Sequence, residues 1–254
     1  MCIRDSICKG IAERIKKEVS DPVMAKTLTP DYPFFCKRVL FIDDYYSTFN
    51  KPNVHLVHEP GGVSAITEKG LETASGGSYD FDVIIYATGF DNGLIPFPVV
   101  GKDGVTLADR FGASESNNFQ MTDPETLWGI HVADMPNSYM MIGPQSLNPV
   151  TNVTLLCEEQ SKYIASIVSE MKKDGYCEVE PKQEAVARWS SKCNETAEGK
   201  VWLQCNNWYT KSTKTDEKAG RQRSRLMWME SYETYLRHLI GGEEGARNEH
   251  LRFS

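Results

Sequence analysis

Helical periodicity among the apolar residues predicts the main helices of the chain. The clearest helix covers about residues 152–173, where apolar side chains recur every three or four positions. Thr151 or Asn152 can cap its first turn, and Gly175 follows its last turn, where a left-handed residue commonly ends a helix. Further helical segments are predicted over residues 8–20, 45–49 and 232–240, and from residue 181 onward.

Short apolar runs between these helices predict strands. Residues 39–42 are predicted as a strand and residues 53–57 as a buried strand. Residues 82–86, apolar after one polar residue, have the pattern of a buried strand in a parallel sheet. Two alternating segments, 63–68 and 71–74, flank a Lys-Gly pair and predict a hairpin. Shorter strands are predicted over residues 138–142 and 226–229. Because strand and helix signals alternate along the chain, the sequence predicts an α/β fold.

Composition narrows the class of ligand. The chain has 254 residues, 40% hydrophobic and 25% charged, which fits one large globular domain or two small ones. Its 28 basic and 35 acidic residues give a net charge of -7, which argues against nucleic acid as a partner because phosphate binding needs a basic face. No apolar run reaches the ~20 residues of a membrane helix, and no signal peptide is recognisable. We therefore expect a cytoplasmic protein that acts on small molecules.

The cysteines and histidines predict neither a disulfide framework nor a metal site. The cysteine count is seven, an odd number, and the sequence has no CxxC pair. We therefore expect reduced thiols. His55 and His58 form an HxxH within a predicted strand, where these two positions point to opposite faces. That geometry argues against a shared metal ion.

The first six residues, MCIRDS, match one translated reading frame of a common transposon-end sequencing adapter. We therefore expect residues 1–6 to be derived from an adapter and the reading frame to be truncated at its 5′ end. The alternative is that these residues are a genuine N-terminus.

Four short segments have the composition of ligand sites, although each also fits an ordinary structural role. Residues 87–91 follow a predicted buried strand, where small residues let a dinucleotide approach closely or simply make a tight turn. Lys37 and Arg38 can hold an anion or be a solvated surface pair. Residues 143–152 lead into the long helix, whose free N–H groups favour an anionic ligand or only form a packed entry. Residues 208–210 can line a site for an aromatic ligand or pack in the core.

Taken in order, six segments resemble the C-terminal portion of the Baeyer–Villiger monooxygenases, the NADPH-dependent class B flavoprotein monooxygenases. The segments are DYPFFCKR (31–38), DDYYSTFNKPNVHLV (43–57), DVIIYATGFD (82–91), GKDG with LADRF (101–111), MPNSYMMIGPQSLNPVTN with EEQSKYI (135–164), and ETAEGK with NNWYT (195–210). ATGFD is shared with related flavoenzymes, whereas DYPFFCKR followed by YYSTFNKPNVHLV is much more specific. The resemblance extends from about residue 8 to about residue 240.

The resemblance implies an incomplete α/β flavoprotein built from two dinucleotide-binding domains. Residues 7–92 would be the C-terminal part of the NADPH-binding domain, and residues 93–254 the C-terminal part of the FAD-binding domain. The glycine motifs for both cofactors and the family's histidine-tryptophan fingerprint would lie upstream, and the sequence contains no GxGxxG. Because the first βαβ unit carries the main pyrophosphate site, we expect the chain alone to be inactive.

The chemistry that the resemblance implies is oxygen insertion next to a ketone carbonyl. NADPH would reduce FAD, O2 would add to the reduced flavin, and the resulting peroxyflavin would attack the ketone to give an ester or lactone. Sulfides and amines are alternative substrates of such enzymes. No protein partner is indicated.

Three residues match family positions that act at the reaction centre or on NADPH. Arg38 matches the arginine that stabilises the peroxyflavin and the tetrahedral adduct, a task that a permanent cation suits. Lys37 matches a neighbour associated with recognition of the NADPH phosphate. Trp208 matches a loop tryptophan that closes over the nicotinamide cofactor.

Four others match positions along the cofactors. Thr88 and Gly89 match the strand-end motif between the two domains. Asn152 and Val153 match the helix start whose backbone faces the pyrimidine edge of the flavin, where the helix dipole would favour the anionic reduced form.

The sequence departs from the family pattern in three places. Phe35 occupies a position where the family usually has glycine, which we expect to change the turn and the direction of Arg38. Residues 211–221 differ from the family's cofactor loop, which makes its closure uncertain. The segment Gln145–Pro149 also differs in detail, which leaves the choice of substrate open.

Two other functions remain open on the sequence alone. The departures at Phe35 and in the cofactor loop also fit a related flavin monooxygenase that oxidises nitrogen or sulfur. The missing dinucleotide motifs fit a short, non-catalytic binding module.

Overall fold

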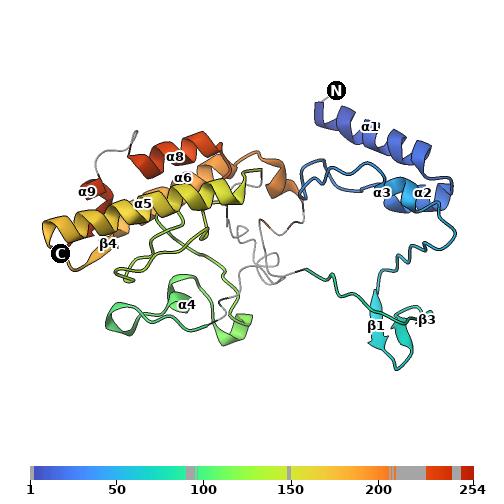
Figure 1. Cartoon of the computed structure of the whole chain (residues 1–254), viewed down its shortest axis with the longest axis horizontal. Coiled ribbons are helices and arrows are strands. Elements are labelled where there is room, and N and C mark those ends of the chain that lie inside the picture. The colour runs from blue at the N-terminus through green and yellow to red at the C-terminus, as the bar shows by residue number, and fades with distance from the viewer. Residues whose placement is uncertain are drawn as a thin grey trace. The chain divides into compact units, whose positions relative to one another are not determined.

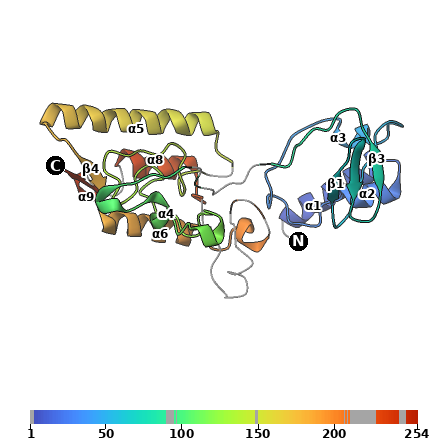
Figure 2. The same ribbon diagram turned by 90° about the horizontal axis from the view of Figure 1, so that it is seen from below.

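The computed structural model describes residues 3–89, 95, 97–147, 150–205, 207, 209, 227–241 and 247–254. The chain forms two compact units, one of residues 1–34 with 39–91 and the other of residues 35–38 with 92–254 (Figures 1 and 2). Residues 35–38, here called the Arg38 strip, thus belong to the second unit, although the chain on both sides belongs to the first.

Three helices of the first unit enclose a small apolar core. They are α1 (Ile3–Glu18), α2 (Pro22–Leu28) and α3 (Tyr45–Thr48). Ile15, Val19 and Ala25 are buried together, so the amphipathic pattern predicted over residues 8–20 is confirmed. Helix α1 begins within the segment expected to derive from an adapter. Asp21 caps α2 by accepting a hydrogen bond from the backbone N–H of Val23 at 2.8 Å.

The sheet of the first unit is an antiparallel meander. Its strands β1 (Val63–Ile66), β2 (Gly70–Thr73) and β3 (Ser78–Asp80) lie in that order. The hairpin predicted at the Lys-Gly pair is confirmed, with Thr67 N–H donating to the Gly70 carbonyl at 2.9 Å. Glycine is required at position 70, because a Cβ atom there would lie 1.9 Å from the Tyr79 carbonyl oxygen.

The three apolar runs predicted as strands are irregular, so the strands predicted over residues 39–42 and 53–57 and the buried parallel strand predicted over residues 82–86 were wrong for the chain as described. Phe41 is 95% exposed and Ile85 is 85% exposed. The backbone N–H groups of residues 39–42 and 83–88 donate to no described residue. A parallel strand is stable only between neighbouring strands and under covering helices, and the described residues supply neither at these positions.

The second unit is built around one long helix and a short two-stranded sheet. Its helices are η1 (Lys102–Gly104), α4 (Leu107–Arg110), η2 (Glu115–Asn117), α5 (Val153–Asp174), α6 (Gln183–Ala197), η3 (Val201–Gln204), α8 (Tyr232–Ile240) and α9 (Arg247–His250). Strands β4 (Val179–Pro181) and β5 (Leu251–Phe253) pair antiparallel. The helices predicted over 152–173 and 232–240 and after residue 181 are confirmed, but residues 138–142 and 227–229 are irregular rather than strands.

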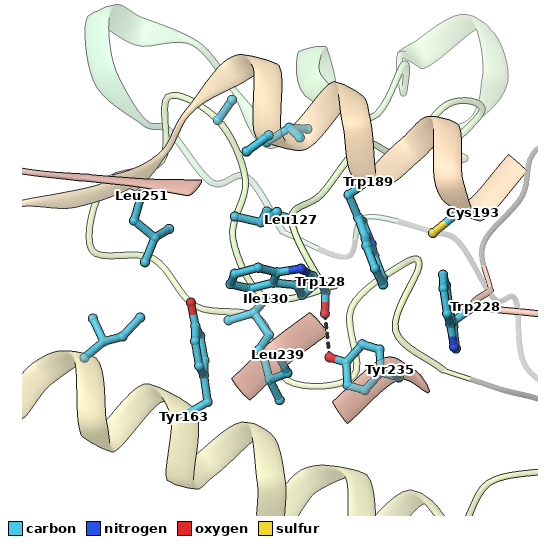
Figure 3. Close-up of a cluster of buried hydrophobic side chains, with 14 of the residues drawn as sticks. Leu127, Trp128, Ile130, Tyr163, Trp189, Cys193, Trp228, Tyr235, Leu239 and Leu251 are labelled. Atoms are coloured by element: carbon cyan, nitrogen blue, oxygen red, sulfur yellow. Dashed lines mark hydrogen bonds between the residues drawn. The ribbon is translucent and has the colours of Figure 1, made fainter. Parts of the chain in front are cut away.

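Aromatic side chains fill the core between these helices (Figure 3). The rings of Trp189 and Trp228 stack with centroids 4.7 Å apart. Trp128 is 1% exposed, and its carbonyl accepts a hydrogen bond from the Tyr235 hydroxyl at 2.6 Å. This core joins α5, α6 and α8 to the irregular segment around residue 128, so it fixes the loop that leads into α5.

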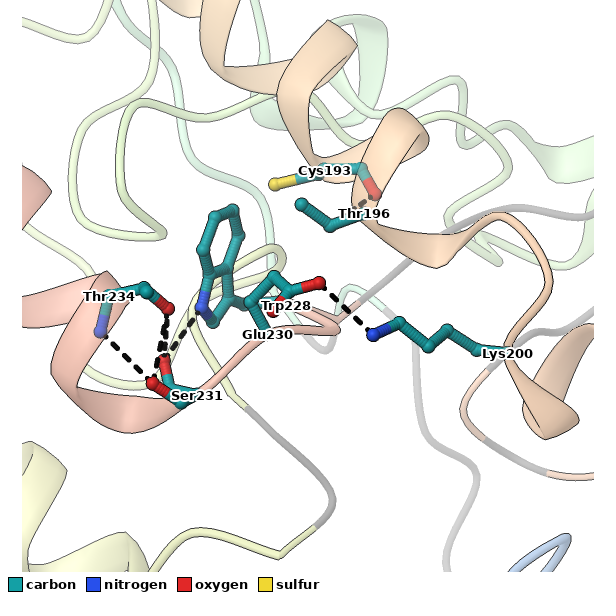
Figure 4. Close-up of polar contacts among 7 residues, drawn as sticks. All are labelled: Cys193, Thr196, Lys200, Trp228, Glu230, Ser231 and Thr234. Carbon is teal, nitrogen blue, oxygen red and sulfur yellow. Dashed lines mark hydrogen bonds and ion pairs between the residues drawn. The ribbon is translucent and has the colours of Figure 1, made fainter.

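Polar contacts fix the start of α8 (Figure 4). The Ser231 hydroxyl accepts from the Thr234 N–H at 3.2 Å and caps the helix, while the Trp228 indole N–H donates to the Ser231 carbonyl at 3.1 Å. Lys200, just after α6, forms an ion pair with Glu230 at 3.0 Å. These contacts join the ends of α6 and α8 around the buried Trp228.

The described elements mix helices and sheet, as the predicted α/β class requires. None of the helices in the described part of the chain combines the length and the apolar character needed to cross a bilayer.

Candidate functional site

The Arg38 strip begins with a residue in a backbone conformation that suits glycine. Phe35 has a φ of 68°, in the left-handed region that L-residues adopt only at a cost of about 1–2 kcal/mol. Glycine adopts this conformation without that cost, and the expected effect of Phe35 on the turn and on the direction of Arg38 stays a prediction. Lys37 and Arg38 follow on the surface, with both side chains exposed.

A disulfide fixes this strip, contrary to the prediction of reduced thiols throughout. Cys36 is bonded to Cys205, with the two Cα atoms 6.1 Å apart and 169 positions between them in the sequence. This pair could not be predicted from the sequence, because neither spacing nor motif connects two cysteines so far apart. The bond places Arg38 within two residues of a covalent attachment to the segment after η3.

The start of α5 presents an exposed helix N-terminus. Asn152 is the cap, and its Oδ1 atom accepts hydrogen bonds from the Thr154 N–H at 3.0 Å and the Thr154 hydroxyl at 2.6 Å. Asn152, Val153, Thr154 and Leu155 are all exposed. An uncovered first turn of a helix of 22 residues carries free N–H groups and partial positive charge, which suit an anionic ligand edge.

Gln145 fixes the loop that leads into this helix. Its side chain is 4% exposed, accepts from the Thr126 N–H at 3.0 Å and donates to the Ser190 hydroxyl at 3.1 Å. Its own φ of 71° lies in the left-handed region. The sequence had marked Gln145–Pro149 only as a point of difference from the family, and residues 148–149 of that segment lie outside the described residues.

Gln160, on α5, is a second buried glutamine that holds the same loop. It is fully buried, accepts from the Ile142 N–H at 2.9 Å and donates to the Tyr235 hydroxyl at 2.8 Å. Burial raises the pKa of Tyr235, so this hydroxyl keeps its proton and donates a hydrogen bond to the Trp128 carbonyl oxygen. A polar residue on the apolar stripe of the predicted helix was the available signal for Gln160, which the sequence analysis missed.

Thr88 and Gly89 lie in the first unit and are exposed. Gly89 has a φ of 85°, so the chain turns there in a conformation that favours glycine. The expected strand before this turn does not form.

The predicted site residues are thus distributed between both units. Lys37, Arg38, Asn152 and Val153 all belong to the second unit. Within the described part of the chain, no hydrogen bond joins Arg38 to either residue of the helix start. Trp208 lies outside the described residues.

Curated proteins with similar sequences are monooxygenases. The chain is 34% identical over 208 residues to 2-oxo-Delta(3)-4,5,5-trimethylcyclopentenylacetyl-CoA monooxygenase of Pseudomonas putida, covering 80% of this chain and 36% of that protein. It is 36% identical over 203 residues to the Baeyer-Villiger monooxygenase peniC of Penicillium patulum, covering 76% of this chain and 31% of that protein. The chain thus spans about a third of the length of these relatives. No family model matches the chain.

Solved structures give the same result for the fold. The crystal structure of OTEMO in complex with FAD and NADP (form 4) matches with a TM-score of 0.84 and 30% identity, covering 99% of this chain and 44% of that one. A closed crystal structure of cyclohexanone monooxygenase matches with a TM-score of 0.80 and 25% identity, covering 98% of this chain and 45% of that one.

Proposed function

The chain belongs to the Baeyer–Villiger monooxygenase family as a C-terminal portion, and we propose that the full-length protein is an NADPH- and FAD-dependent monooxygenase that inserts oxygen next to a ketone carbonyl. The product is an ester or lactone, and the co-substrate is O2. The match of 99% of this chain to a structure described with FAD and NADP is the observation that carries the proposal.

Arg38 is the catalytic residue in this proposal. Its guanidinium is exposed, and the strip that carries it is fixed through Cys36. Bound FAD supplies activated oxygen after reduction by NADPH. A permanent cation beside the carbonyl then stabilises the negative charge that develops on the carbonyl oxygen during oxygen insertion. Lys37, adjacent and also exposed, binds the phosphate of NADPH.

The helix start at Asn152 and Val153 would hold the pyrimidine edge of the flavin. The fit rests on the uncovered first turn of α5, whose N–H groups suit an anionic edge. Gln145 and Gln160 hold the segment at residues 142–145, which precedes that turn in the sequence.

The remaining site residues complete the cofactor sites in the same proposal. Thr88 and Gly89 are assigned to the strand-end motif for cofactor binding, near the end of the NADPH-binding part in residues 7–92. Trp208, which lies outside the described residues, would close over the nicotinamide cofactor. Because the sequence has no glycine-rich pyrophosphate motif, this chain alone supplies only part of each cofactor site and is inactive.

The test is substitution of Arg38 in the full-length enzyme. Arg38→Ala should lower ester formation from a ketone by roughly 100-fold or more, while NADPH still reduces the flavin. Arg188→Ala is the matched control, because Arg188 is an exposed arginine on α6 and should leave both steps unchanged. Undiminished ester formation by the Arg38→Ala enzyme would overturn the role assigned to this residue.

The choice of substrate needs a separate assay. A ketone and a sulfide are offered to the same enzyme, and the products are identified by mass spectrometry. Ester or lactone formation supports oxygen insertion, whereas sulfoxide formation with no ester supports the alternative of a sulfur- or nitrogen-oxygenating enzyme.

A further inference from the structure

Cys36 and Cys205 form a covalent link between two segments far apart in the sequence. The Cα–Cα distance of 6.1 Å lies within the usual span of a disulfide, so the backbone needs no rearrangement to form the bond. Four other described cysteines, Cys8, Cys157, Cys177 and Cys193, are free. The bond is therefore specific to the pair that includes the neighbour of Lys37 and Arg38.

The Cys205 end of the bond is held by hydrogen bonds from Asn207. The Asn207 side chain donates to the carbonyl oxygens of Trp202 and Cys205, at 2.7 Å and 3.1 Å, and accepts from the Tyr209 N–H at 2.9 Å. Tyr209 is 1% exposed and packs with Met229 and neighbouring residues in a small apolar cluster. The disulfide therefore attaches Cys36 to a part of the second unit that these contacts hold in place.

The Cys36 end lies in a short strip whose neighbours in sequence belong to the other unit. Only residues 35–38 join the second unit before the chain returns to the first at Val39. A bond within so short a strip restrains every residue of it, and Arg38 is two positions away from the bonded cysteine. The bond therefore restrains the Arg38 strip.

We propose that Cys36 and Cys205 are an oxidation site for hydrogen peroxide, at which a reversible disulfide controls the mobility of the Arg38 strip. The reduced pair leaves the strip mobile, and the oxidised pair holds it against the turn after η3. The consequence for catalysis rests on the proposed role of Arg38, whereas formation of the bond and its effect on mobility do not.

The chemistry balances with one peroxide for each bond. Cys205 is 9% exposed and Cys36 is fully buried, so the Cys205 thiolate attacks the peroxide first. Its sulfur becomes a sulfenic acid, and the other peroxide oxygen leaves as water after protonation. The Cys36 thiol then displaces the hydroxyl as a second water, and the S–S bond forms. Two molecules of glutathione reverse the step, becoming glutathione disulfide while both thiols are regenerated.

The first experiment maps the bond in the full 254-residue chain. The chain is reduced, the reductant is removed, and dilute hydrogen peroxide is added before tryptic digestion under non-reducing conditions. The expected product is a linked pair of peptides, residues 27–37 with residues 201–211, which glutathione separates again. Cys36→Ser and Cys205→Ser each abolish this product, whereas Cys177→Ser, at an exposed free cysteine, retains it.

The order of reaction gives a sharper check. In the Cys36→Ser chain, dimedone should label Cys205 as a trapped sulfenic acid. In the Cys205→Ser chain, Cys36 should stay unlabelled. Labelling of Cys36 alone would contradict the assigned order, and absence of the linked peptide, or a link that millimolar glutathione leaves intact, would overturn the proposal of a reversible site.

Limited proteolysis measures the effect on the strip. Native trypsin should cut after Lys37 or Arg38 roughly tenfold more slowly in the oxidised chain, because cleavage needs local opening of the strip. Cleavage after Lys69, in the exposed turn between β1 and β2, is the control and should not change. Equal rates at Lys37 and Arg38 in both redox states would show that the bond does not control the strip. None of these three experiments requires FAD, so their results are independent of the test of the proposed function.

Discussion

Alanine is more stabilising than glycine within helices and strands, and we predict the opposite order of stability for the two substitutions at Phe35. Its φ of 68° is a conformation that alanine tolerates poorly and glycine tolerates well. Phe35→Gly and Phe35→Ala both remove the ring, so the contacts that the ring makes are lost equally. The difference between these two variants therefore isolates the backbone.

Two opposing contributions set the magnitude. A left-handed residue other than glycine costs about 1–2 kcal/mol. Glycine loses more conformational freedom on folding than alanine, which costs about 0.5–1 kcal/mol. The balance predicts that Phe35→Gly has a larger free energy of unfolding than Phe35→Ala, by roughly 0.5–1 kcal/mol.

The measurement is urea denaturation of both variants under identical redox conditions, followed by tryptophan fluorescence. Ser161, exposed on α5, supplies the control pair, where alanine should be more stable than glycine by about 1 kcal/mol because the position is helical. If alanine at position 35 equals or exceeds glycine in stability, the strip does not have a left-handed turn, and the reasoning about how Arg38 is positioned fails.

Three further predictions concern the second unit. Burial lowers the pKa of His131 to about 3, below its unfolded value of about 6.5, so the unfolded chain binds the extra proton first as the pH falls. The free energy of unfolding should therefore drop by about 2 kcal/mol between pH 7 and pH 5, and His131→Gln should remove that contribution; an unchanged pH slope in this variant would contradict it. Gln160→Leu removes the hydrogen-bond partner of the Ile142 N–H and of the Tyr235 hydroxyl, and should lower the free energy of unfolding in urea by about 2–4 kcal/mol. A decrease below about 0.5 kcal/mol, which is typical of a neutral surface substitution, would refute the role of Gln160. Reduction of the Cys36–Cys205 bond should lower the free energy of unfolding by up to about 5 kcal/mol, from the chain entropy of a loop of 169 residues, with no change expected in Cys36→Ser; an equal response of that variant would refute the assignment.

The sequence predicted the local elements well where the signal is periodic. The long helix was expected over 152–173 and covers Val153–Asp174, with Asn152 as its cap and Gly175 at φ 79° after it. Caps and amphipathic stripes depend on residues a few positions apart, so they can be read from the sequence alone. The hairpin at the Lys-Gly pair was predicted for the same reason.

Features that depend on distant residues were not predicted. The runs 39–42 and 82–86 have the composition of buried parallel strands, but a strand needs neighbours that no local pattern supplies. The Cys36–Cys205 bond joins residues 169 positions apart. Gln160 is polar, yet it lies fully buried because Ile142 and Tyr235 bring it hydrogen-bond partners from other segments.

The same distinction between local signals and distant contacts applies to the site residues. The helix start at Asn152 was predicted from a local pattern, and the structure describes that start directly, whereas the role of Asn152 and Val153 at the flavin was assigned through the resemblance. Lys37 and Arg38 were identified through a resemblance, because two adjacent basic residues have no distinctive spacing. Their assigned roles remain proposals that the substitution of Arg38 tests.

The central claim, that this chain is part of a larger two-cofactor monooxygenase, is tested most directly by extending the transcript upstream of Ile7 from the source RNA. The account predicts one continuous reading frame that replaces residues 1–6 and carries two glycine-rich dinucleotide motifs. A stop codon followed by a native start codon near Ile7, with no glycine motif before it, would contradict the account and favour a short binding module.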